Sequence, residues 1–298
     1  MIADRDPREV LRHLVRWASH RDSVRAVLLT SSRAKPGAPV DALSDYDVLL
    51  VVEDIRPFFE DRSWLGDFGE VLVAYWGPIY ADPDHGVERT GNVVQYADGL
   101  HIDFRLWPPA LARRVADAPG LPAELDDGYA VLLDKDVLFD AMASPGHSAY
   151  IPERPDEGTY LTLVNDFFSN VPYVAKCLRR DELLPAKWCL DYGMKHVYLI
   201  PMLEWRMERD RDWSEPTGGR GRGLKGRLPP EIWEELEDTY AGAGIAENWE
   251  ALFGTMALFR RVAEEVADDL GYAYPLDLDR RVTEYARAVK HPGQGSGL

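Results

Sequence analysis

Two aspartates, Asp45 and Asp47, stand at the entrance to the apolar run Val48–Val52 in the sequence DYDVLLVV. A carboxylate beside an apolar core is costly unless a cation is bound to it. If this segment is a strand, residues two apart point to the same face, so Asp45 and Asp47 project together. Mg²⁺ suits such a pair, because it prefers oxygen ligands and often takes one or two protein carboxylates plus substrate phosphates. A strand-opening turn with two solvated acids is the simpler alternative.

Three further features favour the metal-phosphate interpretation. Upstream, VRAVLLTSSR ends in hydroxyl residues, where backbone N–H groups and Ser32 could hold phosphate oxygens. The intervening AKPGAPVDALS is typical of a loop. In LHIDFRLW, the apolar residues alternate with His101, Asp103 and Arg105, which share the other face of a strand. Asp103 is therefore a third acid, placed centrally on another strand, although a same-face pair with Arg105 is its alternative role.

The elements that must position these acids follow from hydrophobic periodicity. We predict a helix over 7–19, and strands at 24–30, 45–52, 69–76, 92–97 and 100–107. Asp98-Gly99 suits a two-residue hairpin turn, whose central positions need positive φ.

The pattern becomes helical after residue 150. One apolar stripe consists of Leu161, Val164, Phe168, Val171 and Ala175. A longer helix over 248–272 ends at a glycine. The sequence thus predicts an α+β protein with a mixed-sheet head over 1–150, a helical domain over 151–290 and a disordered tail over 291–298.

Composition limits the class of partner. With 298 residues, of which 46% are hydrophobic and 29% charged, the chain can bury a core and is expected to form two domains. The net charge of −17 argues against a nucleic-acid partner and favours cationic ligands or metal ions. No signal-peptide core or membrane-length apolar run is present, so we expect a cytoplasmic protein. Cys177 and Cys189 are expected to be buried helical thiols. The oligomeric state is left open.

Taken in order, these motifs resemble those of a known family. A hydroxyl pair, a spacer, a D-x-D that opens an apolar strand and a later aspartate resemble the nucleotidyltransferase superfamily, with Ser31-Ser32 where that superfamily usually has Gly-Ser. The match narrows over most of the chain, and its segments are similar to the aminoglycoside 6-adenylyltransferases, or streptomycin adenylyltransferases: LLTSSRAKP…LSDYDVLLVVED, DGLHIDFRLWP, VNDFFSNVPYVAKCLRRDELLPAKWCLDYGMKHVYLIPMLEWRM, LPPEIWEELEDTYAGAGIAENWEALFGTMALFRRVAEEVADDLGYAYP and DRRVTEYARAV.

This resemblance implies a catalytic head domain, a helical substrate-binding domain, and Mg²⁺-dependent transfer of AMP from ATP to a hydroxyl of an aminoglycoside, most simply streptomycin, with release of pyrophosphate. The physical logic agrees, because a metal pair ~3.5–4 Å apart can neutralise phosphate charge and hold the reacting oxygens in line. Asp45 and Asp47 are then the metal ligands on the triphosphate. Asp103 shares a metal and can take the acceptor proton. Ser31, Ser32 and Arg33 are assigned to the nucleotide phosphates.

Two helical-domain segments carry further predictions. Asp166 is expected on the polar side of its helix, as a solvated acid or as a ligand of a cationic acceptor. Lys187 and Asp191, four residues apart, form either a surface pair or two ligands. In the superfamily a lysine from this domain commonly reaches the triphosphate, so Lys187 is assigned to ATP and Asp191 to the acceptor.

The basic segment 217–228, TGGRGRGLKGRL, is either a phosphate-contacting loop, with Arg222 and Lys225 as contacts, or a disordered linker. It has no Walker pattern. The tryptophans Trp188, Trp205, Trp233 and Trp249 are expected in the core.

Two alternatives to an aminoglycoside enzyme remain open. The acceptor could be a lincosamide or a cellular metabolite, or the chain could be a non-catalytic nucleotide-binding module. The complete set of three acids favours catalysis, because a pure binder does not need Asp103.

Overall fold

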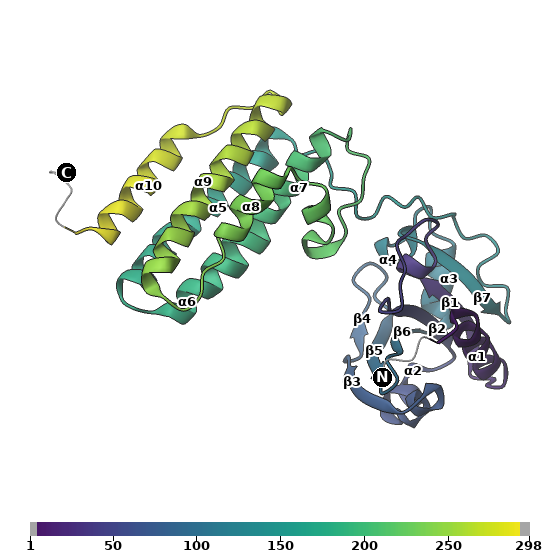
Figure 1. Ribbon diagram of the computed structural model, residues 1–298. Helices are drawn as coiled ribbons and strands as arrows, with labels where there is room; N and C mark the ends of the chain where they lie inside the picture. Colours follow the sequence, from purple (N-terminus) through teal and green to yellow (C-terminus); the bar gives the residue numbers. More distant parts are fainter. Residues whose placement is uncertain (1–4, 293–298) are drawn as a thin grey trace. The chain divides into compact units, whose positions relative to one another are not determined.

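The computed structural model describes residues 5–292, and its chain divides into two compact units, Met1–Ala149 and Tyr150–Leu298 (Figure 1). Most of the predicted tail, residues 293–298, lies outside the described residues. In the part of the chain that is described, no helix is long and apolar enough to cross a membrane.

The first unit is built on a mixed sheet in the order β3-β5-β6-β2-β1-β7, with β4 paired to β5. Only the β2–β6 pair is parallel among these ladders. The strands are β1 Val24–Thr30, β2 Tyr46–Val52, β3 Val71–Trp76, β4 Tyr80–Ala81, β5 Glu88–Tyr96, β6 His101–Trp107 and β7 Tyr129–Asp134. The predicted mixed-sheet head is confirmed, whereas β4 and β7 were not predicted.

Helices cover both faces of this sheet. Successive strand residues point to opposite sides, and apolar residues on each side pack against helices. Even-numbered residues of β2 and β6 pack in one core with α1 Pro7–Ser19, α2 Ile55–Glu60 and the 3₁₀ helix η2 Ser63–Phe68. The other core contains Leu49, Val51 and Trp107, with α3 Pro109–Ala116 and α4 Ala123–Asp126. We call this second side the acidic face, because Asp47, Asp103 and Arg105 lie on it beyond the edge of that core.

The turn between β5 and β6 differs from the prediction. The strand-end residue Tyr96 donates its backbone N–H to Leu100 O at 2.8 Å, which leaves a loop of Ala97, Asp98 and Gly99. Within the Asp98-Gly99 pair only Gly99 has positive φ, at 98°. A three-residue loop with glycine in the left-handed position replaces the two-residue turn, whose two central residues would both need positive φ.

The second unit is helical, as predicted. Its helices are α5 Glu157–Arg179, α6 Leu183–Lys187, the π-helix η3 Trp188–Leu199, α7 Ile200–Arg209, the 3₁₀ turns η4 Gly219–Gly221 and η5 Leu224–Gly226, α8 Pro230–Asp238, α9 Ile245–Leu270 and α10 Leu276–Lys290. The predicted glycine stop is confirmed, because Gly271 follows α9 with φ 76° in the left-handed region that glycine tolerates.

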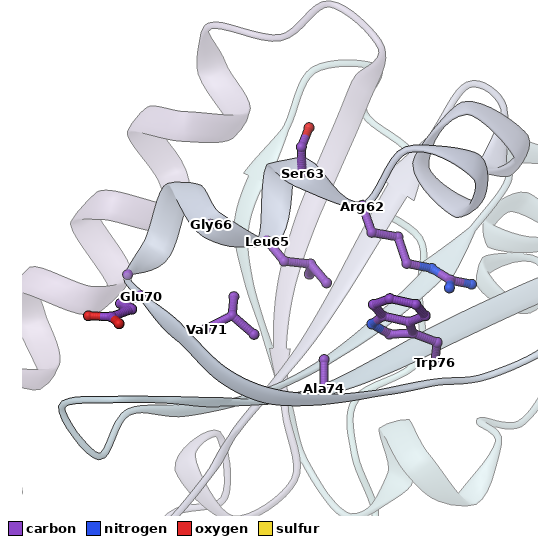
Figure 2. Close-up of a pocket in the computed structure, with 9 residues that line it drawn as sticks. Arg62, Ser63, Leu65, Gly66, Glu70, Val71, Ala74 and Trp76 are labelled. Carbon is purple, nitrogen blue, oxygen red and sulfur yellow. The ribbon is translucent and has the colours of Figure 1, made fainter.

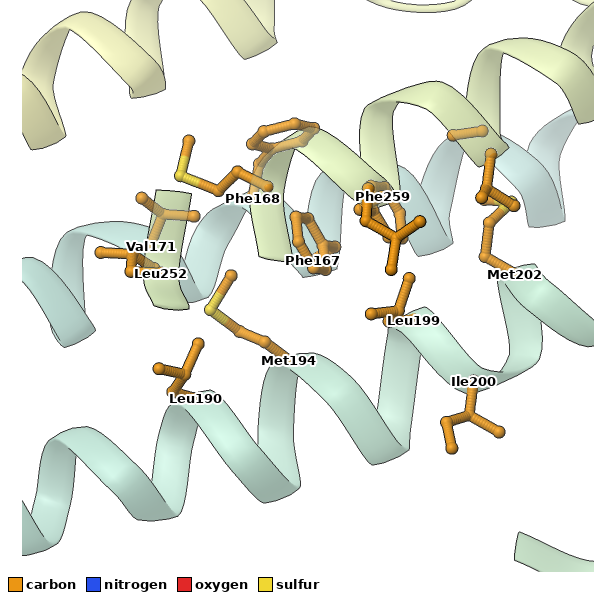
Figure 3. Packing of buried hydrophobic residues seen from close by; sticks show 14 of the residues in the cluster. Phe167, Phe168, Val171, Leu190, Met194, Leu199, Ile200, Met202, Leu252 and Phe259 are labelled. Carbon is orange, nitrogen blue, oxygen red and sulfur yellow. The ribbon is translucent and has the colours of Figure 1, made fainter. Parts of the chain in front are cut away.

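Aromatic packing fixes the centre of this helical core (Figure 3). The rings of Phe167 and Phe259 stack with centroids 3.6 Å apart, and Phe168 packs edge-on against both. The predicted stripe on α5 is buried except for Leu161, which is 37% exposed. Cys177 and Cys189 are buried, as predicted.

The tryptophans divide between core and surface. Trp205 and Trp249 are buried and Trp233 packs partly against the core, but Trp188 is 66% exposed. The core prediction is therefore wrong for Trp188, whose ring lies beside the exposed Tyr192 with centroids 6.1 Å apart.

Candidate active site

The register of two parallel strands brings the predicted acids together. In the β2–β6 ladder Asp47 is the direct partner of Asp103. Neighbouring strands are ~4.8 Å apart, so both carboxylates leave the same face side by side. Asp45 lies one residue before β2, and its charge acts on both of the others. The three acids therefore form one electrostatic group.

Burial disfavours the ionised form of two of these acids. Burial raises the pKa of Asp47 to about 6, and the neighbouring Arg105 guanidinium opposes that rise. Burial likewise raises the pKa of Asp103, against the influence of His101. Desolvation disfavours the charged form of an acid, and a bound cation favours it. This answers the question raised by the D-x-D pattern, because the site has more negative charge than its own cations compensate.

Arg105 is the cation that the sequence analysis did not assign to the site. Its guanidinium lies 3.3 Å from Asp47 Oδ1, donates to Thr30 Oγ1 at 3.2 Å and lies 3.5 Å from Glu124 Oε2. Arg105 thus forms its ion pairs with Asp47 and Glu124, and not with Asp103 as the alternative had suggested. Strand alternation placed Arg105 on the correct face but could not identify its cross-strand partner.

His101 is the second group beside the acids. Its Nε2 atom lies 3.0 Å from Asp103 Oδ1, although neither atom makes a well-directed hydrogen bond. The two residues are two apart on β6, so the strand repeat alone predicts that they share a face. Asp103 Oδ1 is buried and lies against His101.

These residues fit a metal that takes part of its coordination from substrate. Among residues 5–292, no group of three or more His, Cys, Asp or Glu side chains is assembled as a metal cage. Mg²⁺ does not require one, since it is usually bound through one or two carboxylates plus phosphates and water. Asp47 and Asp103 would hold such an ion, with Asp45 as the third candidate ligand.

The hydroxyl pair follows β1 in the 3₁₀ helix η1, Ser31–Arg33. Ser31 has φ 60°, in the left-handed region that costs a non-glycine residue ~1–2 kcal/mol. This conformation gives a physical reason for a glycine in related sequences. The Ser31 N–H donates to Gly128 O at 2.9 Å, and the hydroxyl lies beside Asp47, where it lowers the pKa of that carboxyl. Ser32 is the next residue of the same turn.

Arg33 has partners other than the predicted phosphate. It donates from Nε to Asp45 O and from Nη2 to Asp41 O and Ser44 O, and its guanidinium stacks on the Tyr46 ring. These contacts hold the loop that enters β2.

The helical-unit candidates have their own surroundings. Asp166 lines a shallow hollow of about 540 Å³ with Thr162, Leu163 and Tyr198, among others. Its carboxylate accepts a hydrogen bond from Asn165 Nδ2 at 3.4 Å.

Lys187 and Asp191 form the predicted i,i+4 pair, at 2.8 Å. Asp191 also accepts from Lys195 Nζ at 2.7 Å, and Lys195 is fully buried. The two ammonium groups hold the pKa of Asp191 below its usual value against the effect of burial. Both lysines also donate to backbone oxygens, Lys187 to Ala241 O and Lys195 to Thr239 O. The two lysines therefore tie α6 and η3 to the end of α8 and the chain after it, and Asp191 neutralises their charge.

The basic segment 217–228 is folded and is no disordered linker. Leu224 and Leu228 are buried in the helical core, and Thr217 donates its N–H to Tyr150 O at 3.0 Å. The exposed Lys225 ammonium pairs with Glu237 at 3.2 Å. Arg222 follows the turn η4.

Two hollows of the first unit differ in chemistry. One, of about 530 Å³, lies between η2 and β3 and is lined by Leu65, Ala74 and Trp76 with Arg62 at one end (Figure 2). Ala74 and Trp76 pair with Val94 and Asn92 on the side opposite the acidic face. A second hollow, of about 320 Å³, contains Asp103 and Arg105 and has Tyr75 and Val93 in its wall. Only the second hollow adjoins the acids.

Comparison with known proteins gives the family of the chain. The family model described as streptomycin adenylyltransferase matches residues 4–289. An aminoglycoside 6-adenylyltransferase of Bacillus subtilis is 29% identical over 96% of this chain and 98% of its own. One of Campylobacter jejuni is 29% identical over 94% of each chain. A crystal structure of an aminoglycoside 6-adenyltransferase from Bacillus subtilis aligns over 96% of this chain and 99% of that chain with 24% identity and a TM-score of 0.44.

The chain belongs to the streptomycin adenylyltransferase family, since the family model covers nearly all of it. The predicted family and enzyme class are therefore confirmed.

Proposed function

We propose that this member of the streptomycin adenylyltransferase family transfers AMP from ATP to a hydroxyl of an aminoglycoside, with streptomycin as its preferred acceptor and pyrophosphate as the second product. The observation that carries the proposal is the direct pairing of Asp47 and Asp103 across the parallel β2–β6 ladder, with Asp45 beside them. A half-buried group of three acids suits metal-bound phosphate better than a neutral ligand.

Mg²⁺, when bound, would neutralise phosphate charge and orient the triphosphate. The chain supplies the remaining functions. Asp45 and Asp47 hold the nucleotide end of the site, beside the Ser31-Ser32 turn. Asp103 lines the hollow next to Arg105, and its carboxylate is assigned to take the proton of the acceptor's hydroxyl. Burial raises the pKa of Asp103, which makes it a stronger base than an exposed carboxylate.

The acceptor is proposed from charge. Streptomycin carries two guanidinium groups, which form their best contacts with carboxylates in paired geometry. The chain has a net charge of −17, so salt should weaken the attraction of such a cation. We assign Asp166 to this acceptor and Lys187, Arg222 and Lys225 to the nucleotide phosphates. Asp191 is assigned to the acceptor as well, with its two lysines as competing partners.

The test is a direct assay with ATP, Mg²⁺ and a panel of acceptors, in which pyrophosphate release and product mass are measured. Streptomycin should be adenylylated in preference to kanamycin, which lacks the streptidine ring. Equal turnover of both drugs would refute the preference. Turnover of a lincosamide or of a metabolite alone would replace the acceptor class, and nucleotide binding without turnover of any acceptor would indicate the non-catalytic module.

Two variants separate the roles of the acids. Asp103→Asn should abolish turnover while Mg–ATP binding, measured by calorimetry, weakens only modestly, because Asp45 and Asp47 remain. Asp166→Ala should raise the Michaelis constant for streptomycin more than that for ATP. An Asp103→Asn protein that turns over normally would contradict the base assignment.

A further inference from the structure

We infer that Arg33 is a positioning residue that fixes the direction in which Asp45 and Asp47 enter the site. The expected effect on metal and nucleotide binding rests on the proposed function, because the same carboxylates are involved. It assigns Arg33 a contact with the chain itself and no direct contact with phosphate.

The guanidinium of Arg33 donates hydrogen bonds to three backbone carbonyls of one loop. Nε donates to Asp45 O at 2.9 Å, while Nη2 donates to Ser44 O at 2.7 Å and to Asp41 O at 3.2 Å. Its Cζ atom lies 3.8 Å from the centroid of the buried Tyr46 ring. Tyr46 is the first residue of β2. One planar side chain therefore connects the end of the loop to the start of the strand.

The loop between the serine pair and the acids has two anchors, Lys35, which pairs with Asp127 at 2.8 Å and holds its first half, and Arg33, which holds residues 41–45. The loop contains Pro36, Gly37 and Pro39, and its apolar residues Val40 and Leu43 are exposed. In its second half the internal bonds form one small turn, in which Asp41 accepts from the Leu43 N–H and the Ser44 hydroxyl, each at 2.9 Å. Such a turn fixes its own shape but not its attachment to the sheet, which Arg33 provides.

This attachment matters most at Asp45. Asp45 precedes β2, which begins at Tyr46. Its backbone carbonyl accepts a hydrogen bond from Arg33. Asp47 follows two residues later, within the ladder. A displacement of ~1 Å in a catalytic group can reduce a rate by ~100-fold. Loss of Arg33 should therefore impair metal-nucleotide binding through Asp45 while the rest of the sheet keeps its pairing.

Arginine is required for this arrangement, because only a planar guanidinium offers several donors in a fixed fork and can stack on an aromatic ring. Lysine at position 33 would keep the charge but could not reach the three carbonyls and stack on Tyr46 at once. The pair Arg33→Ala and Arg33→Lys thus separates geometry from charge.

The control is Arg5→Ala. Arg5 lines the same small hollow as Arg33, of about 140 Å³, but it donates to Asp98 and to Phe68 O instead of to the loop. Its removal deletes a guanidinium close by and leaves the contacts of residues 41–45 unchanged.

Three measurements test the inference. Hydrogen exchange of the amides over 40–46 should accelerate at least 10-fold in Arg33→Ala and in Arg33→Lys, with the remainder of β2 protected, and should be unchanged in Arg5→Ala. The Mg²⁺ concentration for half-maximal ATP binding should rise ~10- to 100-fold in both Arg33 variants. Added methylguanidinium should restore part of the nucleotide binding of Arg33→Ala.

Wild-type exchange over 40–46 in the Arg33 variants would overturn the inference. If those amides stay protected in the Arg33 variants while nucleotide binding is lost, Arg33 contacts the phosphate directly and the inference is wrong. If Arg33→Ala fails to fold, Arg33→Lys carries the same tests. The exchange and ATP-binding measurements require no acceptor, so failure of wild-type protein to modify any aminoglycoside would reject the proposed acceptor without affecting this result.

Discussion

Asp47→Asn should inactivate the protein and, at neutral pH, stabilise its first unit. The substitution keeps the size of the side chain and removes a charge that is 13% exposed. Burial raises the pKa of Asp47 from 3.8 to about 6, and this difference of about 2 units, at about 1.36 kcal/mol per unit, corresponds to an upper limit of about 3 kcal/mol. Arg105 loses part of its ion pairing in the variant, so we expect a gain of about 1–3 kcal/mol at pH 8.

The pH dependence identifies the cause of that gain. A carboxyl whose pKa is higher in the folded than in the unfolded state binds its proton more tightly when folded. Its destabilising effect is absent below about pH 4, develops as pH rises through the interval from about 4 to about 6, and is complete above. The variant should therefore exceed wild type in stability at pH 8 and equal it at pH 4.

Hydrogen exchange of the buried β2 amides, corrected for intrinsic rates and measured without Mg²⁺, reports on this unit separately from the helical unit. Asp136→Asn is a control of opposite sign, because its Arg25 partner lowers the pKa of Asp136 and its loss should destabilise the protein at pH 8. A variant Asp47→Asn that is no more stable at pH 8, or equally stabilised at pH 4, would refute the reasoning. Retained AMP transfer in a folded variant would remove Asp47 from the site.

Three further predictions concern stability and are measurable by denaturant unfolding. Ser31→Gly should be ~1–2 kcal/mol more stable than Ser31→Ala, because both lose the hydroxyl but only alanine retains the left-handed strain; equal stabilities would contradict the strained turn. Lys195→Met should destabilise the helical unit by ~1–3 kcal/mol, since Thr239 O and Asp191 lose a buried donor, and a neutral outcome would show that this network is dispensable. Gly271→Ala should cost ~1 kcal/mol at the end of α9, where φ is 76°, and an unchanged unfolding midpoint would exclude the assigned cap.

The sequence predicted the fold where a local period was strong. The alternation in LHIDFRLW correctly placed Asp103 and Arg105 on one face, because burial of the alternate residues determines the face of a strand. It could not show that β2 and β6 are parallel neighbours in register. That pairing depends on long-range topology, and it brings Asp103 to Asp47. The strand β7 was missed for a local reason, since its residues are only partly buried and carry no clear alternation.

Polar partners were the least predictable feature. Arg33 was assigned to phosphate from its place beside the serine pair, and no local pattern indicated the three loop carbonyls to which it donates. Trp188 was assigned to the core from helical spacing, but the wide turn of the π-helix η3 changes which residues face inward. In both cases the residue type was informative, and its contacts depended on geometry that no local pattern contains.

The two units use buried acids in opposite ways. Asp191 has two lysines, one of them fully buried, at 2.7 and 2.8 Å, and these hold its pKa below the usual value. Asp47 has one arginine at 3.3 Å, which it shares with Glu124, and its pKa stays raised. A carboxylate with complete partners gains little from a further cation, whereas an undercompensated one gains the energy that burial has cost it. Under the proposed function, the incomplete pairing of Asp47 would therefore give the acidic face its affinity for a metal and its phosphates, and a second cation placed beside Asp47 would stabilise the free protein at the expense of that affinity.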